Sequence, residues 1–173
     1  MTRVIGVAIR KVTRLGHPVL RAPCRHLTPD EILSADVQRL IEEMAVTMAE
    51  YEGVGIAANQ VGEGISGFLM GLEEGSPRHK EGIPLTVVFN PEVRFLSEET
   101  AVDWEGCLSI PGLRGQVRRR LKLELSGLDH DAKPFTRVYE GFPARVVQHE
   151  ADHLNGFVYL DRMDGLKTLG YVE

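Results

Sequence analysis

The clearest alternation of apolar and polar positions lies between residues 28 and about 50. The start, Thr28-Pro29-Asp30-Glu31, combines an N-cap threonine, a proline at the first helical position and a glutamate three residues after the cap. The residues behind it show helical spacing on one face, at Leu33, Val37, Leu40, Ile41, Met44 and Met48. The pattern predicts an N-terminal amphipathic helix that ends before Gly53 and buries this stripe.

A second helix is expected from about Pro143 to Leu154, because proline suits the first turn and Gly156 stands where a helix commonly ends. Segments of strand character, separated by turn-forming residues, cover residues 67–72, 85–90, 92–96, 116–126 and 135–139. The expected fold class is α+β, with mostly antiparallel sheets packed around the C-terminal helix. The length of 173 residues suits a single domain, residues 1–173.

Composition and charge narrow the class of protein. The net charge of −5 argues against a DNA-binding protein, which usually shows a broad basic face. No stretch approaches the roughly 20 apolar residues of a membrane-spanning helix, and residues 1–10 have too short an apolar run for a signal peptide. We therefore expect a soluble cytoplasmic protein without DNA or membrane partners, or an organellar one whose transit peptide was removed.

The two cysteines, Cys24 and Cys107, are too few for a secreted disulfide scaffold. A single bridge between them is the alternative to a reduced chain, which is favoured and which leaves Cys107 free for chemistry.

The second helix carries the pattern His149-Glu150-Ala151-Asp152-His153. Residues four apart lie on the same helical face, so both imidazoles can reach one metal ion. Glu150 follows the first histidine directly, which suits a general base acting on water at that ion. The alternative is a pair of surface histidines on an exposed helix. The apolar segment that precedes the motif and the neighbouring Asp152, as a partner of His153 or a cap, favour the metal site.

A catalytic metal site needs three protein ligands and an open position. The candidates for the third ligand are Cys107, Asp103, Glu105, Asp161, His17, His26, His79 and His130. Cys107 stands out because Gly106 precedes it and Pro111-Gly112 follows, which suggests a strand that ends in a shaped loop. The alternative for this cysteine is a small buried apolar residue.

A third segment, residues 53–60, contains two glycines and two alanines and ends at Gln60. Its small side chains allow close approach of the backbone to a ligand or to another element of the protein. It lacks the Gly-Lys-Ser/Thr of a phosphate loop and the glycine spacing of a dinucleotide site. A tight helix-to-strand connection is the alternative.

In this order and spacing, the three segments resemble the motifs of the peptide deformylase family. The family's glycine-rich motif ends in glutamine, as residues 53–60 do here. Its Glu-Gly-Cys-Leu-Ser motif matches residues 105–109, and its Gln-His-Glu-x-Asp-His-Leu motif matches residues 148–154. The similarity extends over most of the chain, from Leu15 to Asp161.

The resemblance implies an enzyme, a peptide deformylase, that removes the formyl group from the N-terminal formylmethionine of newly made polypeptides. It implies one divalent metal ion held by Cys107, His149 and His153, and metal-bound hydroxide that attacks the formyl carbon with Glu150 as general base and acid. Gln60 and the backbone N–H of Leu108 are implied to meet the carbonyl oxygen.

The resemblance also implies substrate contacts, at Val54, Gly55, Gly106, Arg114, Phe142 and Val146. The methionine side chain is expected near the apolar members, and the peptide backbone near the two glycines. The resemblance implies Fe2+ as the metal, because members of the family resemble one another in using it, and zinc, nickel or cobalt can also occupy the site. The expected partners are N-formylmethionyl peptides or nascent chains, with a transient ribosome contact.

Two departures from the family pattern affect the ribosome contact and the pocket. Many bacterial members end in a long basic helix thought to dock on the ribosome, which this chain lacks. Residues 118–120, three arginines, are the substitute contact, with a solvated strand edge as the favoured alternative. Asn59 stands where Thr or Pro is expected.

Two other functions compete with the deformylase. A metalloprotease with the same helical motif usually takes its third ligand downstream, where this chain offers only Asp161 and Asp164. A non-catalytic metal-binding or ribosome-associated relative would have no need of Glu150 and Gln60.

Overall fold

A computed structural model describes residues 6–172. The helices are α1 (Pro29–Ile32), α2 (Ala35–Glu50) and α3 (Phe142–Leu154), and short 3-10 helices cover Pro18–Leu20, Ala58–Val61 and Tyr159–Arg162. The strands are β1 (Gly55–Ala57), β2 (Gly67–Leu72), β3 (Ile83–Phe95), β4 (Thr100–Cys107), β5 (Ile110–Arg120), β6 (Lys122–Leu128), β7 (Pro134–Glu140) and β8 (Gly170–Tyr171).

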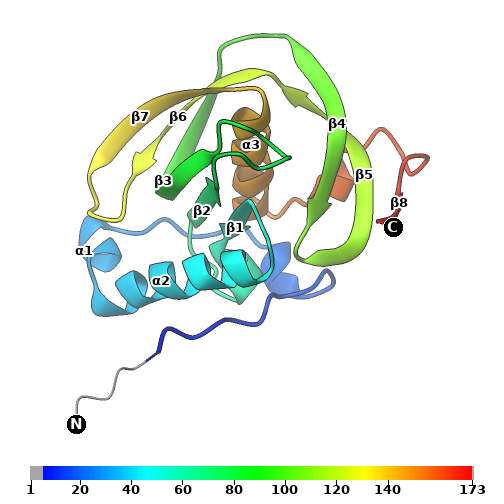
Figure 1. The fold of residues 1–173 in the computed structure, drawn as a ribbon. Coiled ribbons are helices and arrows are strands. Elements are labelled where there is room, and N and C mark those ends of the chain that lie inside the picture. Colours follow the sequence, from blue (N-terminus) through cyan, green and yellow to red (C-terminus); the bar gives the residue numbers. More distant parts are fainter. Residues whose placement is uncertain (1–5, 173) are drawn as a thin grey trace.

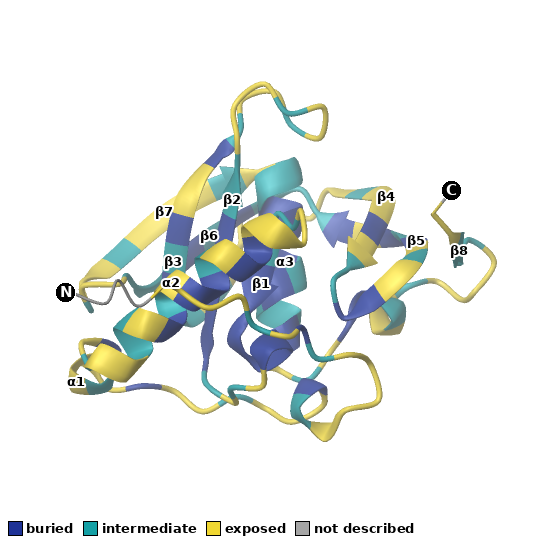
Figure 2. Cartoon of the chain, turned by 60° about the horizontal axis from the view of Figure 1, so that its bottom comes forward, coloured by how far each residue is buried: buried dark blue, intermediate teal, exposed yellow. Residues whose placement is uncertain are grey.

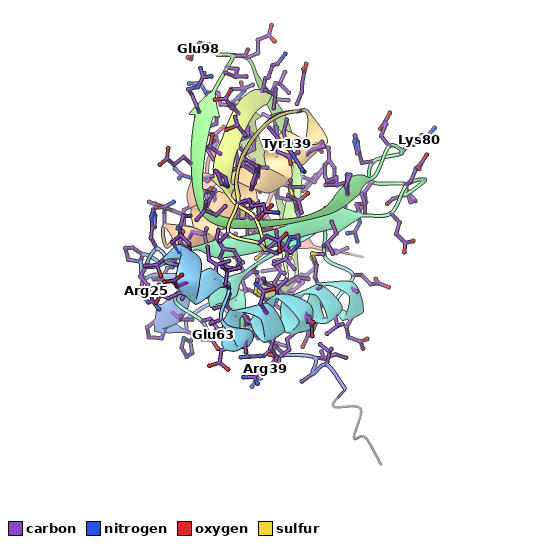
Figure 3. All side chains as sticks on the ribbon, turned by 90° about the vertical axis from the view of Figure 1, so that its left-hand side faces the viewer. Arg25, Arg39, Glu63, Lys80, Glu98 and Tyr139 are labelled. Atoms are coloured by element: carbon purple, nitrogen blue, oxygen red, sulfur yellow. The ribbon has the colours of Figure 1, made fainter. Side chains whose placement is uncertain are left out.

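The strands form two antiparallel sheets with α3 between them. The larger sheet has the order β1-β2-β3-β6-β7, and the smaller has the order β4-β5-β8. Figure 1 shows α3 enclosed by these strands, with α2 below it and β8 on the outer side of β5. The loop that carries Lys80 and the loop that carries Glu98 project away from this body (Figure 3). The predicted α+β class, with antiparallel sheets around the C-terminal helix, is confirmed.

Helix α3 is covered on nearly all sides, which Figure 2 shows as an almost continuous run of buried and intermediate residues. Its apolar residues Ala144, Val147 and Leu154 pack into the main core with Phe68 and Leu125. Four of its polar residues contact the hairpin formed by β4 and β5, namely Arg145, Gln148, His149 and Asp152. The helix is therefore amphipathic, yet its polar stripe meets protein rather than water.

The N-terminal amphipathic helix is present, but it is not continuous. Helix α1 ends at Ile32, and Ser34 caps a new helix by accepting a hydrogen bond from the backbone N–H of Val37 at 3.4 Å. Of the predicted stripe, Leu40, Met44 and Met48 are buried, whereas Leu33 at the break is 54% exposed. The serine offers the backbone a local partner, and this interrupts the helix that the apolar spacing predicted.

The predicted strands are placed correctly but divided differently. Segments 85–90 and 92–96 belong to the single strand β3, which continues across an irregularity in its pairing with β6, near Asn90 (φ 50°). Segment 116–126 is two strands, β5 and β6, because the chain changes sheets around Leu121. Strands β1 and β8 were not predicted, and of β4 only its end at Cys107 was expected.

Both cysteines are free thiols, as expected for a reduced chain. Within residues 6–172, no helix is both long enough and apolar enough to cross a bilayer. The expectation for residues 1–10 falls partly outside the described residues.

The end of α3 offers a test of how tightly the helix is seated. Gly156 has φ +81°, and a Cβ there would lie 2.4 Å from the carbonyl oxygen of Arg21. We expect Gly156→Ala to lower the free energy of unfolding by about 3 kcal/mol, from left-handed strain plus the clash with backbone.

Gly165→Ala is the matched control, because Gly165 has φ +96° with open space around its Cα. It carries the strain alone, and about 1 kcal/mol is expected. Urea unfolding of both variants gives the comparison. Equal losses would show that the contact with Arg21 contributes nothing.

Candidate metal centre

Three candidate metal ligands, one from β4 and two from α3, lie close together. Cys107 ends β4, whereas His149 and His153 lie on successive turns of α3. Their ligand atoms all lie within 4.8 Å of one another, and the distance from Cys107 Sγ to His153 Nε2 is 3.3 Å. The two imidazole rings are 5.1 Å apart and nearly perpendicular. The helical spacing therefore places both histidines on one face of α3, and the fold brings Cys107 to that face.

The other candidates for a third ligand lie outside this group. Within residues 6–172, the one further cluster is Asp129, His130 and Asp131, in the exposed turn between β6 and β7. Its Asp129 carboxylate accepts hydrogen bonds from the backbone N–H groups of Asp131 and Lys133, as an ordinary turn residue does. Glu105 contacts His149 instead of joining the ligands.

The donor set suits a divalent transition-metal ion. One thiol sulfur and two imidazole nitrogens are typical ligands of such ions, and three of them leave a fourth position open. In the described part of the chain, the buried carboxylate oxygen Glu150 Oε2 has no hydrogen-bond partner. Glu150 lines the same pocket as Cys107 and His149. A buried acceptor without a partner beside an open ligand position is what a site for an ion and its water requires.

Glu105 orients the first histidine. Its Oε1 lies 2.8 Å from His149 Nδ1, and Arg119 donates to both of its oxygens at 2.9 and 3.0 Å. Burial would raise the pKa of Glu105, but the hydrogen bonds from His149 and Arg119 hold this pKa well below its ordinary value. A carboxylate accepts the proton of Nδ1, so Nε2 is left free for a metal.

Glu150 is buried against Gly55 of the glycine-rich segment, residues 53–60. A Cβ at Gly55 would lie 2.4 Å from Glu150 Oε1, so only glycine lets the carboxylate occupy this position. Burial raises the pKa of Glu150 to about 7. The small residues of segment 53–60 thus allow a close approach to another element, namely to Glu150 of α3. The same segment forms β1 and a 3-10 helix, so the connection between α2 and β2 also contains a strand.

Gln60 lies behind the cysteine. Its Oε1 accepts from the backbone N–H of Ala57 at 2.9 Å, and its Nε2 donates to Ser109 Oγ at 3.1 Å and to Cys107 Sγ at 3.4 Å. The neighbouring Asn59 donates to the backbone carbonyl of His153 at 2.6 Å. The side-chain amides of Asn59 and Gln60 therefore connect segment 53–60 to His153 and Cys107 by hydrogen bonds.

A pocket of about 850 Å³ between the two sheets is lined by two of the three ligands, Cys107 and His149. Of the residues expected to bind substrate, the pocket is lined by Val54, Gly55, Gly106, Phe142 and Val146, and also by Leu108. Arg114 does not line it. Its guanidinium stacks 4.7 Å from the ring centre of Trp104, which does line it.

The second cysteine differs from the first in its surroundings. Cys24 lies outside the ligand group, and burial raises the pKa of its thiol to about 11. A thiol that stays protonated is a poor ligand, because the thiolate is the form that binds metal.

The sequence did not indicate the charged residues around Glu105. Arg145 was part of a segment described as apolar, yet it is buried and donates to Glu105. Arg119, expected on a solvated strand edge, is 6% exposed and donates to Asp152 at 2.6 Å. Asp152 accepts from arginines instead of supporting His153. The available signal was the spacing of residues 145, 149 and 152 on one helical face.

Comparisons with known proteins agree with this geometry. The family model described as polypeptide deformylase matches residues 9–169. Peptide deformylase 1 of Nitrosomonas europaea is 41% identical over 167 residues, 95% of this chain and 93% of the relative.

Solved structures give the same result. A Met-Ala-Ser-bound class I type b peptide deformylase from Acinetobacter baumannii has a TM-score of 0.85 and 34% identity, covering 91% of this chain and all of that one. A Synechococcus elongatus peptide deformylase in complex with actinonin has a TM-score of 0.79 and 31% identity, covering 95% and 88%. By its motifs, its fold and its relatives, this chain belongs to the peptide deformylase family.

Proposed function

We propose that this chain removes the formyl group from the N-terminal formylmethionine of new polypeptides with one divalent metal ion, and that Cys107, His149 and His153 hold this ion. The family consists of metalloenzymes that remove N-terminal formyl groups. The observation that supports the residue roles is the convergence of one sulfur and two imidazoles beside the buried Glu150.

A divalent ion held by Cys107, His149 and His153 would supply Lewis acidity, which would make water a nucleophile near neutral pH. Glu150 is the general base and acid: its carboxylate takes a proton from the attacking water and returns it to the leaving amine. Because Gly55 has no side chain, the carboxylate has room to lie in the pocket beside Cys107 and His149.

Gln60 and the backbone N–H of Leu108 stabilise the carbonyl oxygen as it becomes negative. Gln60 Nε2 lies next to Cys107, and Leu108 follows Cys107 in the chain and lines the pocket. Both donors therefore lie beside the ligand that ends β4. A donor aimed at a developing oxyanion typically contributes about 3 kcal/mol to lowering the barrier.

The pocket accommodates the methionine side chain and the start of the peptide. Val54, Phe142 and Val146 supply apolar surface for the side chain, and Gly55 and Gly106 meet the peptide backbone. Arg114, stacked on Trp104, lies along the path of the following residues. The Met-Ala-Ser bound to the Acinetobacter baumannii enzyme is a peptide of this class.

The remaining parts of the proposal concern the metal and the cell. We favour Fe2+ because the family's motifs are those of enzymes that use it. Zinc, nickel or cobalt are the substitutes, because a thiolate and two imidazoles suit all of these ions. Residues 1–173 act as one catalytic domain in the cytoplasm, on nascent chains and in transient contact with the ribosome.

The reaction is tested with formyl-Met peptides and matching unblocked peptides, using protein prepared and analysed for metal without oxygen. We expect formate release from the formylated peptides and no cleavage of internal peptide bonds. Cleavage of unblocked peptides would identify a metalloprotease instead.

Glu150→Gln is expected to lower kcat by about 10²- to 10⁴-fold, the usual contribution of general acid–base catalysis. The amide keeps the shape of the side chain but cannot accept the proton, so metal content is expected to stay at the wild-type level. Turnover at the wild-type rate would remove Glu150 from the mechanism.

Cys107→Ala is expected to weaken metal binding sharply, because two imidazoles remain of three ligands. Cys24→Ala is the matched control, since Cys24 lies outside the ligand group. Metal analysis after dialysis measures both variants. A full equivalent of metal in the Cys107 variant would show that the third ligand lies elsewhere.

A further inference from the structure

Helix α3 presents a buried polar stripe to the hairpin of β4 and β5. Gln148 exchanges two hydrogen bonds with the backbone of Arg120, at 3.1 and 2.9 Å. His149 contacts Glu105 on β4, and Asp152 accepts from Arg119 on β5. Arg145, one turn before His149, belongs to the same stripe and is 7% exposed. Side-chain hydrogen bonds therefore attach this face of the helix to the hairpin.

Arg145 makes three hydrogen bonds to three different points of the hairpin. Its Nη1 donates to Glu105 Oε2 and to the carbonyl of Val117, both at 2.8 Å, and its Nη2 donates to the carbonyl of Ala101 at 2.9 Å. Ala101 and Glu105 lie on β4, and Val117 lies on β5. One planar guanidinium thus fixes both strands relative to α3.

This attachment matters because the metal ligands belong to different parts of the core. The apolar side of α3 packs into the main cluster with Phe68 and Leu125. Cys107 packs against a separate cluster that contains Ile110 and Val117 of the hairpin. The relative position of the sulfur and the two imidazoles therefore depends on the polar contacts between the helix and the hairpin.

We propose that Arg145 is a positioning residue of the metal centre, which holds β4 against α3 so that Cys107 and Glu105 meet the two histidines. The inference rests on the proposed role of Cys107, His149 and His153 as ligands. Arg145 is not one of the metal ligands, and although it lines the pocket, its guanidinium is bonded to the hairpin. Its effect is on where the sulfur lies and on how Glu105 supports His149.

The test compares Arg145→Met and Arg145→Lys with Arg118→Met as control. Methionine keeps much of the volume without donors, and lysine keeps the charge but cannot donate to all three acceptors in a planar fork. Arg118 lies on the same hairpin, but its side chain is 55% exposed. Its ion pair with Asp164 is long, with 3.9 Å between Nε of Arg118 and Oδ2 of Asp164. The three variants and the wild-type protein are prepared free of metal and titrated with Zn2+ against a chromogenic chelator.

We expect both Arg145 variants to bind Zn2+ about 10- to 100-fold more weakly than wild type, the usual effect of losing support around metal ligands. The cobalt-loaded variants are expected to show a weaker thiolate-to-cobalt absorption band, because the sulfur is no longer held at the ion. Arg118→Met is expected to match wild type in both measurements.

Thermal unfolding of the metal-free proteins separates positioning from simple stabilisation. A lower Tm together with wild-type zinc affinity and a wild-type cobalt spectrum would overturn the proposal. Wild-type zinc affinity in Arg145→Lys would also overturn it, and this variant decides the question if Arg145→Met does not fold. A wild-type protein that shows no thiolate-to-cobalt band would instead refute the ligand set itself.

Discussion

Glu105 is a buried carboxylate that accepts hydrogen bonds from Arg119 and Arg145 and contacts Nδ1 of His149. A charge removed from water is costly unless opposite charges and hydrogen bonds surround it. Meeting this requirement draws β4, β5 and α3 together at one point. Arg119 continues the arrangement to Asp152, so the same charges link two turns of the helix to the hairpin.

The metal centre depends on this arrangement because its ligands come from two sources. Helical spacing alone sets the two histidines of α3 near one another. Cys107 ends β4 of the smaller sheet, and a pocket opens where the two sheets face each other. A site built at such a boundary has ligands on rigid elements and an open side for substrate. Gly55 completes it by allowing the carboxylate of Glu150 to approach β1.

Features within one stretch of chain could be predicted from the sequence. The helix that carries His149 and Glu150, the strand that ends at Cys107 and the start of the N-terminal helix all follow from short-range spacing and capping. The break at Ser34 and the division of segment 116–126 into two strands were not predicted. A local hydrogen bond decided the first and the change of sheet decided the second, whereas periodicity responds to neither.

By itself the sequence determined the chemistry on offer: a helical pair of histidines with a glutamate between them, a cysteine in a shaped loop, and a glycine-rich segment. Only the tertiary structure decided that Arg145 and Arg119 are buried partners of Glu105. The bonded atoms of Arg145 and its partners are 28 to 44 residues apart. Contacts at that separation leave no local pattern in the sequence, because they depend on how β4 and β5 pack against α3. An arginine in a helix looks the same in sequence whether it meets water or a carboxylate, and the packing decides which.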